Sequence, residues 1–194
     1  TVKVTGYQWM WKYEYLGENV AFTSRLDRES DRVRQSGVVP TVAANPHYLL
    51  DVDKPLVLPV GVKVRFVITA DDVIHAWWVP ALGWKQDAIP GIINSTWTKI
   101  DQPGIYRGQC AELCGKDHGF MPIVVRAVPR AEFDQWLASK KAAGETTAEP
   151  SQVPETGTGN APRSVDPDMI EDVQQGEEPA APQAPDAAPA EAPS

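Results

Sequence analysis

The chain has 194 residues, of which 42% are hydrophobic, so it is long enough to bury a core. Its formal net charge of −8 is unevenly placed: residues 1–144 hold 17 Lys or Arg against 15 Asp or Glu, whereas residues 145–194 hold one Arg against 11. No apolar run approaches the roughly 20 residues that span a bilayer, so we expect a soluble chain with neither a membrane-spanning segment nor a signal peptide within it. We also expect no nucleic-acid partner.

Alternating apolar and aromatic residues predict short strands separated by Pro and Gly. In the first of these, residues 6–15, rings occupy every second position, so an extended strand would place five of them on one core face. The five are Tyr7, Trp9, Trp11, Tyr13 and Tyr15. Later strands are expected at 62–68, 104–109 and 123–128. A helix is expected after Pro129, because Phe133, Trp136 and Leu137 recur at helical spacing.

The composition changes toward the C-terminus. All seven tryptophans precede residue 138, whereas residues 145–194 contain no aromatic residue and are rich in Pro, Ala and Glu. Such a segment buries too little apolar surface to offset the entropy that folding costs. We therefore predict one folded domain at 1–138 and a disordered, acidic, Pro/Ala-rich tail at 139–194.

Residues 110–121, CAELCGKDHGFM, bring several soft metal-binding side chains into one short loop. Cys114, His118 and Met121 form the thiolate, imidazole and weak thioether set that redox-active copper favours in electron-transfer sites. Cys110 adds a second thiolate, and two cysteines from one loop can both bridge a pair of copper ions. Each copper would then need its own terminal imidazole.

The chain has three histidines, so two candidates outside this loop remain for the second imidazole. His75 follows shortly after the predicted strand at 62–68, and a strand end can aim its side chain. His47 lies in the polar, turn-like sequence NPHY, with neither a neighbouring ligand nor a strand to orient it. We therefore assign His75 as the ligand and expect His47 at the surface.

Three simpler interpretations compete with a copper pair. The two cysteines could form a disulfide, although a disulfide does not explain His118 and Met121 at ligand spacing. Zinc prefers Cys and His without a thioether, and the CxxxC and HxxM spacings are not usual for it. A single blue copper with Cys110 as a bystander is the closest rival.

Over most of its first 138 residues the chain resembles the soluble copper domain of cytochrome c oxidase subunit II. The matching segments are GYQWMWKYEY at 6–15, DDVIHAWWVPALGWKQDAIPG at 71–91 and PGIYRGQCAELCGKDHGFMPIVV at 103–125. The resemblance implies an all-β, cupredoxin-like antiparallel β-sandwich of Greek-key type, with a short C-terminal helix. It also implies a binuclear copper centre, CuA, in which Cys110 and Cys114 bridge while His75 and His118 are terminal ligands.

The resemblance assigns further residues to the site. Met121 and the backbone carbonyl of Glu112 complete the copper ligands, and the Glu112 side chain reaches a magnesium ion shared with subunit I. Trp9 is implied to be an exposed ring through which electrons enter from cytochrome c, which conflicts with its place on a core strand. The docking carboxylates implied around Trp9 are Glu14, Asp53 and Asp72.

These features imply an electron-transfer subunit of a haem-copper terminal oxidase, which is a proton-translocating oxidoreductase. A copper pair capped by protein donors has no open position for a substrate, so the domain should pass electrons. The resemblance implies that they come from cytochrome c and go to the haem of subunit I. Family members carry a transmembrane hairpin upstream, which would place this domain on the periplasmic face of a bacterial inner membrane. The alternatives are the CuA domain of a nitrous oxide reductase and a non-enzymatic copper carrier.

Overall fold

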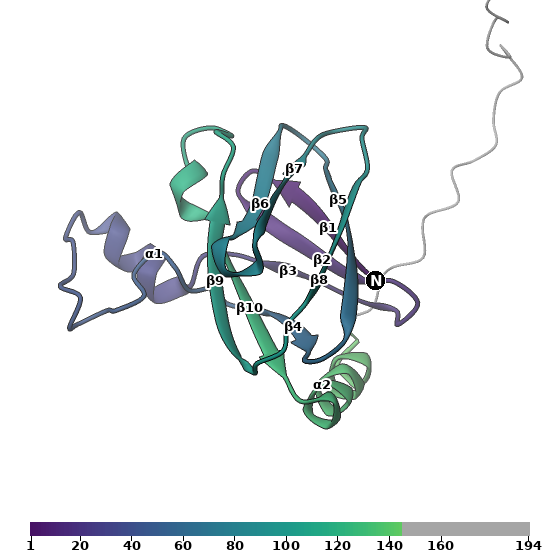
Figure 1. Cartoon of the computed structure of the whole chain (residues 1–194). Coiled ribbons are helices and arrows are strands. Elements are labelled where there is room, and N and C mark those ends of the chain that lie inside the picture. Colours follow the sequence, from purple (N-terminus) through teal and green to yellow (C-terminus); the bar gives the residue numbers. More distant parts are fainter. Residues whose placement is uncertain (145–194) are drawn as a thin grey trace, which may run out of the picture. The chain divides into compact units, whose positions relative to one another are not determined.

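Two five-stranded sheets form a sandwich in the computed structural model, which describes residues 1–144 (Figure 1). The first sheet has the strand order β3-β2-β1-β5-β8. Its strands are β1 (Val2–Tyr7), β2 (Met10–Tyr15), β3 (Val20–Ser24), β5 (Lys63–Ala70) and β8 (Asn94–Lys99). The second sheet has the order β4-β10-β9-β6-β7. Its strands are β4 (Leu56–Pro59), β6 (His75–Val79), β7 (Trp84–Ala88), β9 (Gly104–Cys110) and β10 (Pro122–Val128).

The predicted all-β sandwich is confirmed, but two of its strand pairs are parallel. β1 runs parallel to β5, and β4 runs parallel to β10, whereas the other paired strands are antiparallel. Parallel neighbours need a crossover connection. The chain supplies it by leaving the first sheet after β3, adding β4 to the second sheet and returning for β5.

Large side chains from the facing sides of both sheets fill the core. Phe66 of β5 and Trp77 of β6 have no exposed area, and their ring centroids lie 5.3 Å apart across the sandwich. Trp11 and Ile123 are equally buried, one from each sheet. Because such an interior is close-packed, the strand ends that leave it have fixed positions.

The predicted single strand at 6–15 is wrong, because it is a hairpin that turns at Gln8 and Trp9. β1 ends at Tyr7, which pairs with Met10 at the start of β2. The rings of Trp11, Tyr13 and Tyr15 face the core, whereas those of Tyr7 and Trp9 are only partly buried. Tertiary contacts override the alternation here, since the Gln8 backbone N–H donates to Asp72 and the Trp9 indole donates to the backbone of the loop at 110–121. The conflict over Trp9 is thereby removed.

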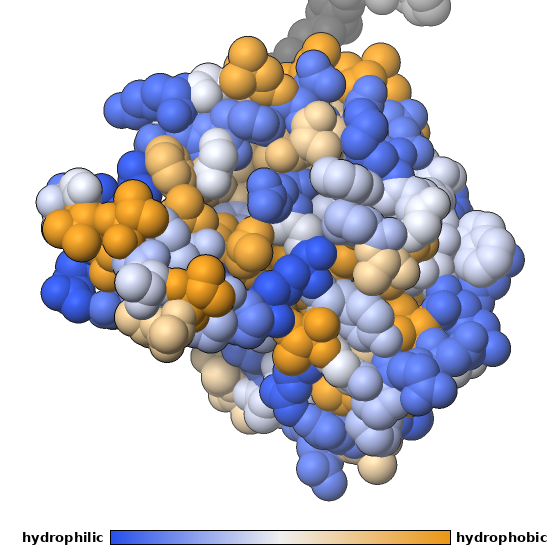
Figure 2. Space-filling view, turned by 60° about the vertical axis from the view of Figure 1, so that its left-hand side comes forward, coloured by the Kyte–Doolittle hydropathy of each residue, from blue (hydrophilic) through white to orange (hydrophobic). Residues whose placement is uncertain are grey.

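Residues 25–55 leave the sandwich between β3 and β4 and include α1 (Arg28–Gln35), which the sequence analysis did not predict. Asp27 caps this helix by accepting from the Ser30 backbone N–H at 2.9 Å. Figure 1 shows α1 standing away from the two sheets. The loop that follows α1 carries three exposed valines, Val38, Val39 and Val42. Figure 2 brings this side of the molecule forward and shows apolar residues among the polar ones at its surface.

The predicted C-terminal helix is confirmed as α2 (Arg130–Ala142), which buries Phe133 and Leu137 against the sandwich. The helix continues past the predicted domain boundary at 138. Lys141 stabilises its last turn, because it bonds to Glu18 at 2.7 Å and its positive charge interacts favourably with the negative end of the helix dipole. Neither helix of the described residues is long and apolar enough to cross a membrane. Residues 139–142 of the predicted disordered tail at 139–194 belong to α2, and the part of that tail from residue 145 onward lies outside the described residues.

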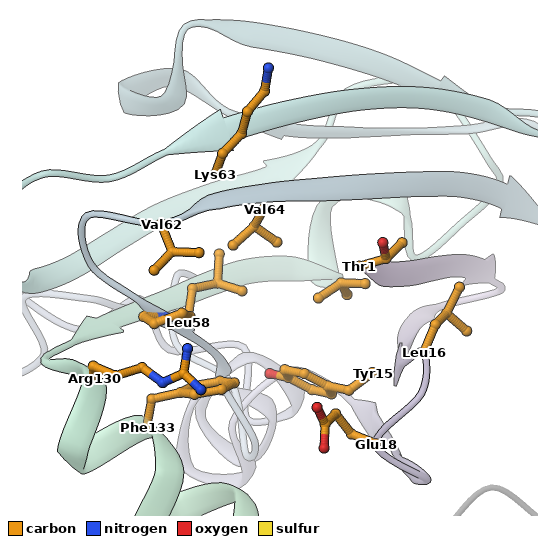
Figure 3. A pocket seen from close by; sticks show the side chains of 12 residues that line it. Thr1, Tyr15, Leu16, Glu18, Leu58, Val62, Lys63, Val64, Arg130 and Phe133 are labelled. Atoms are coloured by element: carbon orange, nitrogen blue, oxygen red, sulfur yellow. The ribbon is translucent and has the colours of Figure 1, made fainter.

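A pocket of about 180 Å³ lies beside the first turn of α2. Figure 3 shows Arg130 and Phe133 on one side of it, with Tyr15 and Lys63 among its other lining residues. The pocket lies at the start of β5. The predicted metal ligands lie near the other end of β5, where Ala70 pairs with Gly6, the residue next to the His75 ring. The pocket contains none of those ligands and belongs to the scaffold.

Replacing Tyr15 with Phe tests how the two sheets are joined. The Tyr15 hydroxyl donates to the Val57 carbonyl at 2.8 Å and accepts from the Val57 N–H at 3.0 Å, in a fully buried place. Removing it leaves two buried backbone groups without a partner, so we expect a loss of about 1–3 kcal/mol in the free energy of unfolding by urea. Tyr106→Phe, which breaks an exposed bond to Gln102, is the control and should cost less. Equal losses would contradict this explanation.

Candidate metal centre

The predicted ligands meet where three strands end on one side of the sandwich. His75 is the first residue of β6, and Cys110 is the last residue of β9, which pairs with β6 through Trp77. The loop at 111–121 then connects β9 to β10 and contains the short 3₁₀ turn η2 (His118–Phe120). Regular strands therefore position two of the ligands, and a loop anchored at both ends positions the others.

The six predicted donors converge on two sulfur atoms. The Sγ atoms of Cys110 and Cys114 lie 3.9 Å apart. Cys110 Sγ lies 3.9 Å from His75 Nδ1 and 3.4 Å from the Glu112 carbonyl oxygen. Cys114 Sγ lies 3.5 Å from His118 Nδ1 and 3.6 Å from the Met121 sulfur. Both cysteines are free, and His47 is exposed in a distant part of the chain, as expected.

Four of the five donor side chains in this cluster are buried, and His118 is partly exposed. His75 and Met121 are at most 1% exposed, and the two cysteines are 5% and 4% exposed. Trp11 closes the site from the core: its ring packs edge-on against His75 at 5.9 Å, and its indole N–H donates to the Met121 carbonyl at 3.3 Å. Burial of this kind excludes water and strengthens the electrostatic interactions inside the site.

The two thiols differ in acidity. Burial raises the pKa of a thiol, but hydrogen bonds with His75 and the backbone outweigh it at Cys110 and lower its pKa to about 7. Burial and the neighbouring Cys110 sulfur raise the pKa of Cys114 to about 12. Cys110 is thus the more acidic of the two thiols, and a metal that takes both sulfurs must displace a proton.

Asp72 orients His75, although we predicted it as a docking carboxylate. Its Oδ1 lies 2.9 Å from His75 Nε2, so the imidazole donates its Nε2–H there and turns Nδ1 toward Cys110. Burial opposes a positive imidazole, yet the bonds to Cys110 and Asp72 raise the pKa of His75 above its usual value. The sequence analysis missed this role, although the spacing of three residues between Asp72 and His75 could have indicated it.

Trp9 lies against the metal loop with its ring partly exposed. Its indole N–H donates to the Cys114 carbonyl oxygen at 3.2 Å, and the Gln8 side-chain amide donates to the same oxygen at 2.8 Å. One edge of the ring is therefore hydrogen-bonded to a ligand residue while part of the ring remains accessible. Lys116 lies 5.8 Å from the ring centroid.

The remaining predicted carboxylates lie in different surroundings. Asp53 is exposed and accepts from the Arg25 backbone N–H at 2.8 Å. Glu14 lies near the opposite end of β2 from the turn that holds Trp9, and its side chain is only 13% exposed between two lysines at 3.3 and 3.4 Å. The Glu112 side chain is exposed, although its carbonyl oxygen points toward the sulfurs.

The donor set fits copper better than zinc. Structural zinc sites use four Cys or His ligands in a tetrahedron, whereas here two sulfurs lie between two imidazoles, a thioether and a carbonyl. Thioether and thiolate together are typical of copper electron-transfer sites. The ligand atoms of His75, Cys110 and Cys114 all lie within 4.8 Å of one another.

The sequence matches a protein family over residues 1–128, and that family is described as cytochrome C oxidase subunit II, periplasmic domain. A probable cytochrome c oxidase subunit 2 of Rickettsia bellii (strain RML369-C) is 49% identical over 140 residues, which are 72% of this chain and 49% of the relative. A cytochrome c oxidase subunit 2 of Aedes aegypti is 44% identical over 142 residues, which are 72% of this chain and 58% of the relative. The chain therefore spans about half the length of the curated relatives it matches.

Two solved structures have a similar fold. The periplasmic domain of subunit II of cytochrome oxidase (CoxB) of Bradyrhizobium japonicum has a TM-score of 0.62 at 41% identity, covering 73% of this chain and 93% of that one. The second is a mixed disulfide intermediate between a thioredoxin-like protein and subunit II of cytochrome c oxidase. Its TM-score is 0.58 at 39% identity, covering 73% of this chain and 90% of that one. These matches confirm the predicted cupredoxin-like sandwich.

Replacing Gly6 with Ala tests how tightly His75 is held. A Cβ atom at Gly6 would lie 2.8 Å from the His75 ring, so the imidazole must shift away from it. Because displaced ligands and outer-shell partners weaken metal sites by about 10- to 100-fold, we expect a loss of copper affinity in that range by competition with a chelator. Gly119→Ala, where a Cβ would meet nothing within 4 Å, is the control within the metal loop. Unchanged affinity in Gly6→Ala would show that the ring is not confined.

Proposed function

This chain belongs to the cytochrome c oxidase subunit II family, and we propose that it holds a binuclear copper centre that carries electrons within a haem-copper terminal oxidase. One observation carries the proposal: the sulfurs of Cys110 and Cys114 lie 3.9 Å apart, and each has its own imidazole Nδ1, at 3.9 and 3.5 Å. Both sulfurs would bridge, and His75 and His118 would be terminal ligands. Met121 and the Glu112 carbonyl would complete the set.

The residues around the sulfurs determine what such a centre can do. When bound, a copper pair supplies one-electron redox chemistry in which the charge is shared between two ions and bond lengths change little. Every donor is a protein atom, so no position is left for a substrate, and the site suits electron transfer rather than bond chemistry. Asp72 orients His75 and Trp11 packs against it, so the donors hold their positions before and after the electron moves.

Trp9 is the proposed entry point for electrons from cytochrome c. Its partly exposed indole bonds directly to the Cys114 carbonyl oxygen, which gives a short route from the surface to a bridging ligand. The Gln8 side-chain amide donates to the same oxygen, so two hydrogen bonds, and not the Trp9 bond alone, fix the position of the loop at Cys114.

Docking of a lysine-rich cytochrome c face would depend on carboxylates near Trp9. Asp53 is exposed, and Asp72, between β5 and β6, contacts the hairpin turn that holds Trp9 by accepting from the Gln8 N–H. Glu14 is compensated by Lys3 and Lys12, so we assign it a smaller share of the attraction. Such steering acts over about a Debye length, roughly 10 Å at 0.1 M salt.

The domain would then pass electrons to the haem of subunit I, where oxygen is reduced to water and protons are translocated. The exposed Glu112 side chain is available for a magnesium ion shared with that subunit, since carboxylate oxygen suits a hard cation. We place the domain on the periplasmic face of a bacterial inner membrane, with a transmembrane hairpin joined to it upstream.

Copper loading would require both cysteines in the reduced state. Their sulfurs are close enough to form a disulfide after a small movement, which an oxidising compartment favours. The mixed disulfide of a relative with a thioredoxin-like protein supports a partner of that class for this chain.

Two other functions have less support. A nitrous oxide reductase would use a similar copper loop, but the family match over residues 1–128 favours the oxidase. A copper carrier needs an accessible site for exchange, whereas Cys110 and Cys114 are 5% and 4% exposed.

Replacing Cys110 with Ser tests the number of coppers. The parent domain should bind two coppers after reduction with a thiol, because both sulfurs bridge. The variant keeps Cys114, His118 and Met121, so it should bind at most one copper. Copper-to-protein ratio and electron paramagnetic resonance measure this, since a shared electron and a mononuclear ion give different hyperfine patterns. Two bound coppers and an unchanged electron paramagnetic resonance spectrum in the variant would contradict the bridging role of Cys110.

Replacing Trp9 with Phe tests the entry route. Phe lacks the indole N–H, but Gln8 still donates to the Cys114 carbonyl, so the copper spectrum should stay intact. Electron transfer within the docked complex with cytochrome c should slow at every salt concentration. Stopped-flow kinetics measure this, with Trp97→Phe on β8 as the control for an exposed tryptophan elsewhere. Transfer at the parent rate in Trp9→Phe would remove the entry role.

A further inference from the structure

Helix α1 contacts the outer side of the metal loop through a single arginine. Arg34 Nη1 lies 3.5 Å from Asp117 Oδ1, and the Arg34 guanidinium carbon lies 4.2 Å from the centre of the Phe120 ring. Arg34 Nε is also held by Asp31 of the same helix at 2.8 Å. The side chain is 26% exposed, so these contacts are partly shielded from water.

Both loop residues that Arg34 contacts are direct neighbours of proposed copper ligands. Asp117 precedes His118, and Phe120 precedes Met121. The sandwich holds the loop from the other side, where Trp9 and Trp11 donate to the carbonyls of Cys114 and Met121.

The helix that carries Arg34 is itself fixed to the sandwich. The two ends of the excursion at 25–55 are joined to each other, because the Asp27 N–H donates to the Asp51 carbonyl and the Asp53 N–H donates to the Arg25 carbonyl, both at 3.0 Å. Asp51 also accepts at 2.7 Å from Arg107 of β9, the strand that ends at Cys110. Arg34 therefore connects the loop to a support that is tied to the same strand as one of the ligands.

We infer that Arg34 is a positioning residue: α1 braces the metal loop through it and restrains the segment that carries His118 and Met121. The inference rests on the proposed copper site for its purpose, but the restraint itself is a property of the metal-free chain. A planar guanidinium can stack on Phe120 and pair with Asp117 at its edge at the same time. A lysine ammonium has no flat face and serves one of these contacts at a time.

The space around Arg34 makes the brace sensitive to its loss. A cleft of about 190 Å³ lies between α1 and the loop, and its lining includes Trp9, Arg25, Arg34 and Phe120. Because the two segments do not pack fully there, removing the guanidinium widens the cleft and leaves Phe120 without its partner. The loop then gains freedom on the side facing α1.

The test compares Arg34→Ala with Arg32→Ala in the whole chain. Arg32 lies on the same helix, is 75% exposed and pairs with Glu29, so its loss controls for helix charge and propensity. In metal-free protein, hydrogen exchange at the Phe120 amide, which bonds to the Asp117 carbonyl, should speed up roughly three- to tenfold in Arg34→Ala. Copper release to a chelator should speed up by a similar factor. Arg34→Lys should fall between Arg34→Ala and the parent.

Each outcome decides the matter. Equal hydrogen-exchange rates at the Phe120 amide in Arg34→Ala and Arg32→Ala would overturn the brace. Exchange at the parent rate in Arg34→Lys would show that a positive charge alone, without the planar guanidinium, is enough. Phe120→Leu removes the ring partner without touching α1, and it should reproduce the faster exchange even if Arg34→Ala fails to fold. A parent chain that binds no copper pair would refute the proposed function, whereas the exchange result in metal-free protein would still decide the brace.

Discussion

Two ionisable, buried sulfurs held 3.9 Å apart are the constraint on which the rest of this molecule depends. Two negative sulfurs at that distance repel each other strongly where water is excluded. Burial raises the pKa of both thiols; hydrogen bonds with His75 and the backbone outweigh it at Cys110, whereas the neighbouring sulfur raises the pKa of Cys114 further. In the proposed site, a cation pair bound by both sulfurs would remove this repulsion and let Cys114 ionise as well.

The sandwich meets this constraint by bringing backbones close together. A Cβ atom at Gly108 of β9 would lie 2.0 Å from the Trp78 carbonyl oxygen of β6, so a side chain there would force the two strands apart. Because β9 ends at Cys110 and β6 begins at His75, this approach sets the spacing of a thiolate and its imidazole. The packed core between the sheets then keeps the strand ends from drifting.

Local chemistry made most of the metal centre predictable from the sequence. Cys110, Cys114, His118 and Met121 are close in the chain, so their spacing alone indicated a common site. His75 followed from its place near a strand end. Contacts between distant segments were not predictable in this way: the turn at Gln8 depends on Asp72, and α1 is a short polar helix whose partners lie in the metal loop. The resemblance named Asp72 for its charge, whereas its bond to His75 appeared only when the fold placed the two side by side.

The hairpin turn at Gln8 and Trp9 also determines when the site can form. Trp9 and Cys114 are 105 positions apart, and β1, which leads into the turn, pairs with the distant strand β5. Contacts of such high sequence separation are slow to form, because a long loop must close before they stabilise the chain. A nascent chain that has not yet released residue 121 lacks a donor, and one whose N-terminal hairpin is undocked lacks the cover of Trp9 and Trp11. In the proposed copper site, complete metal capture would thus require that both ends of the domain have met.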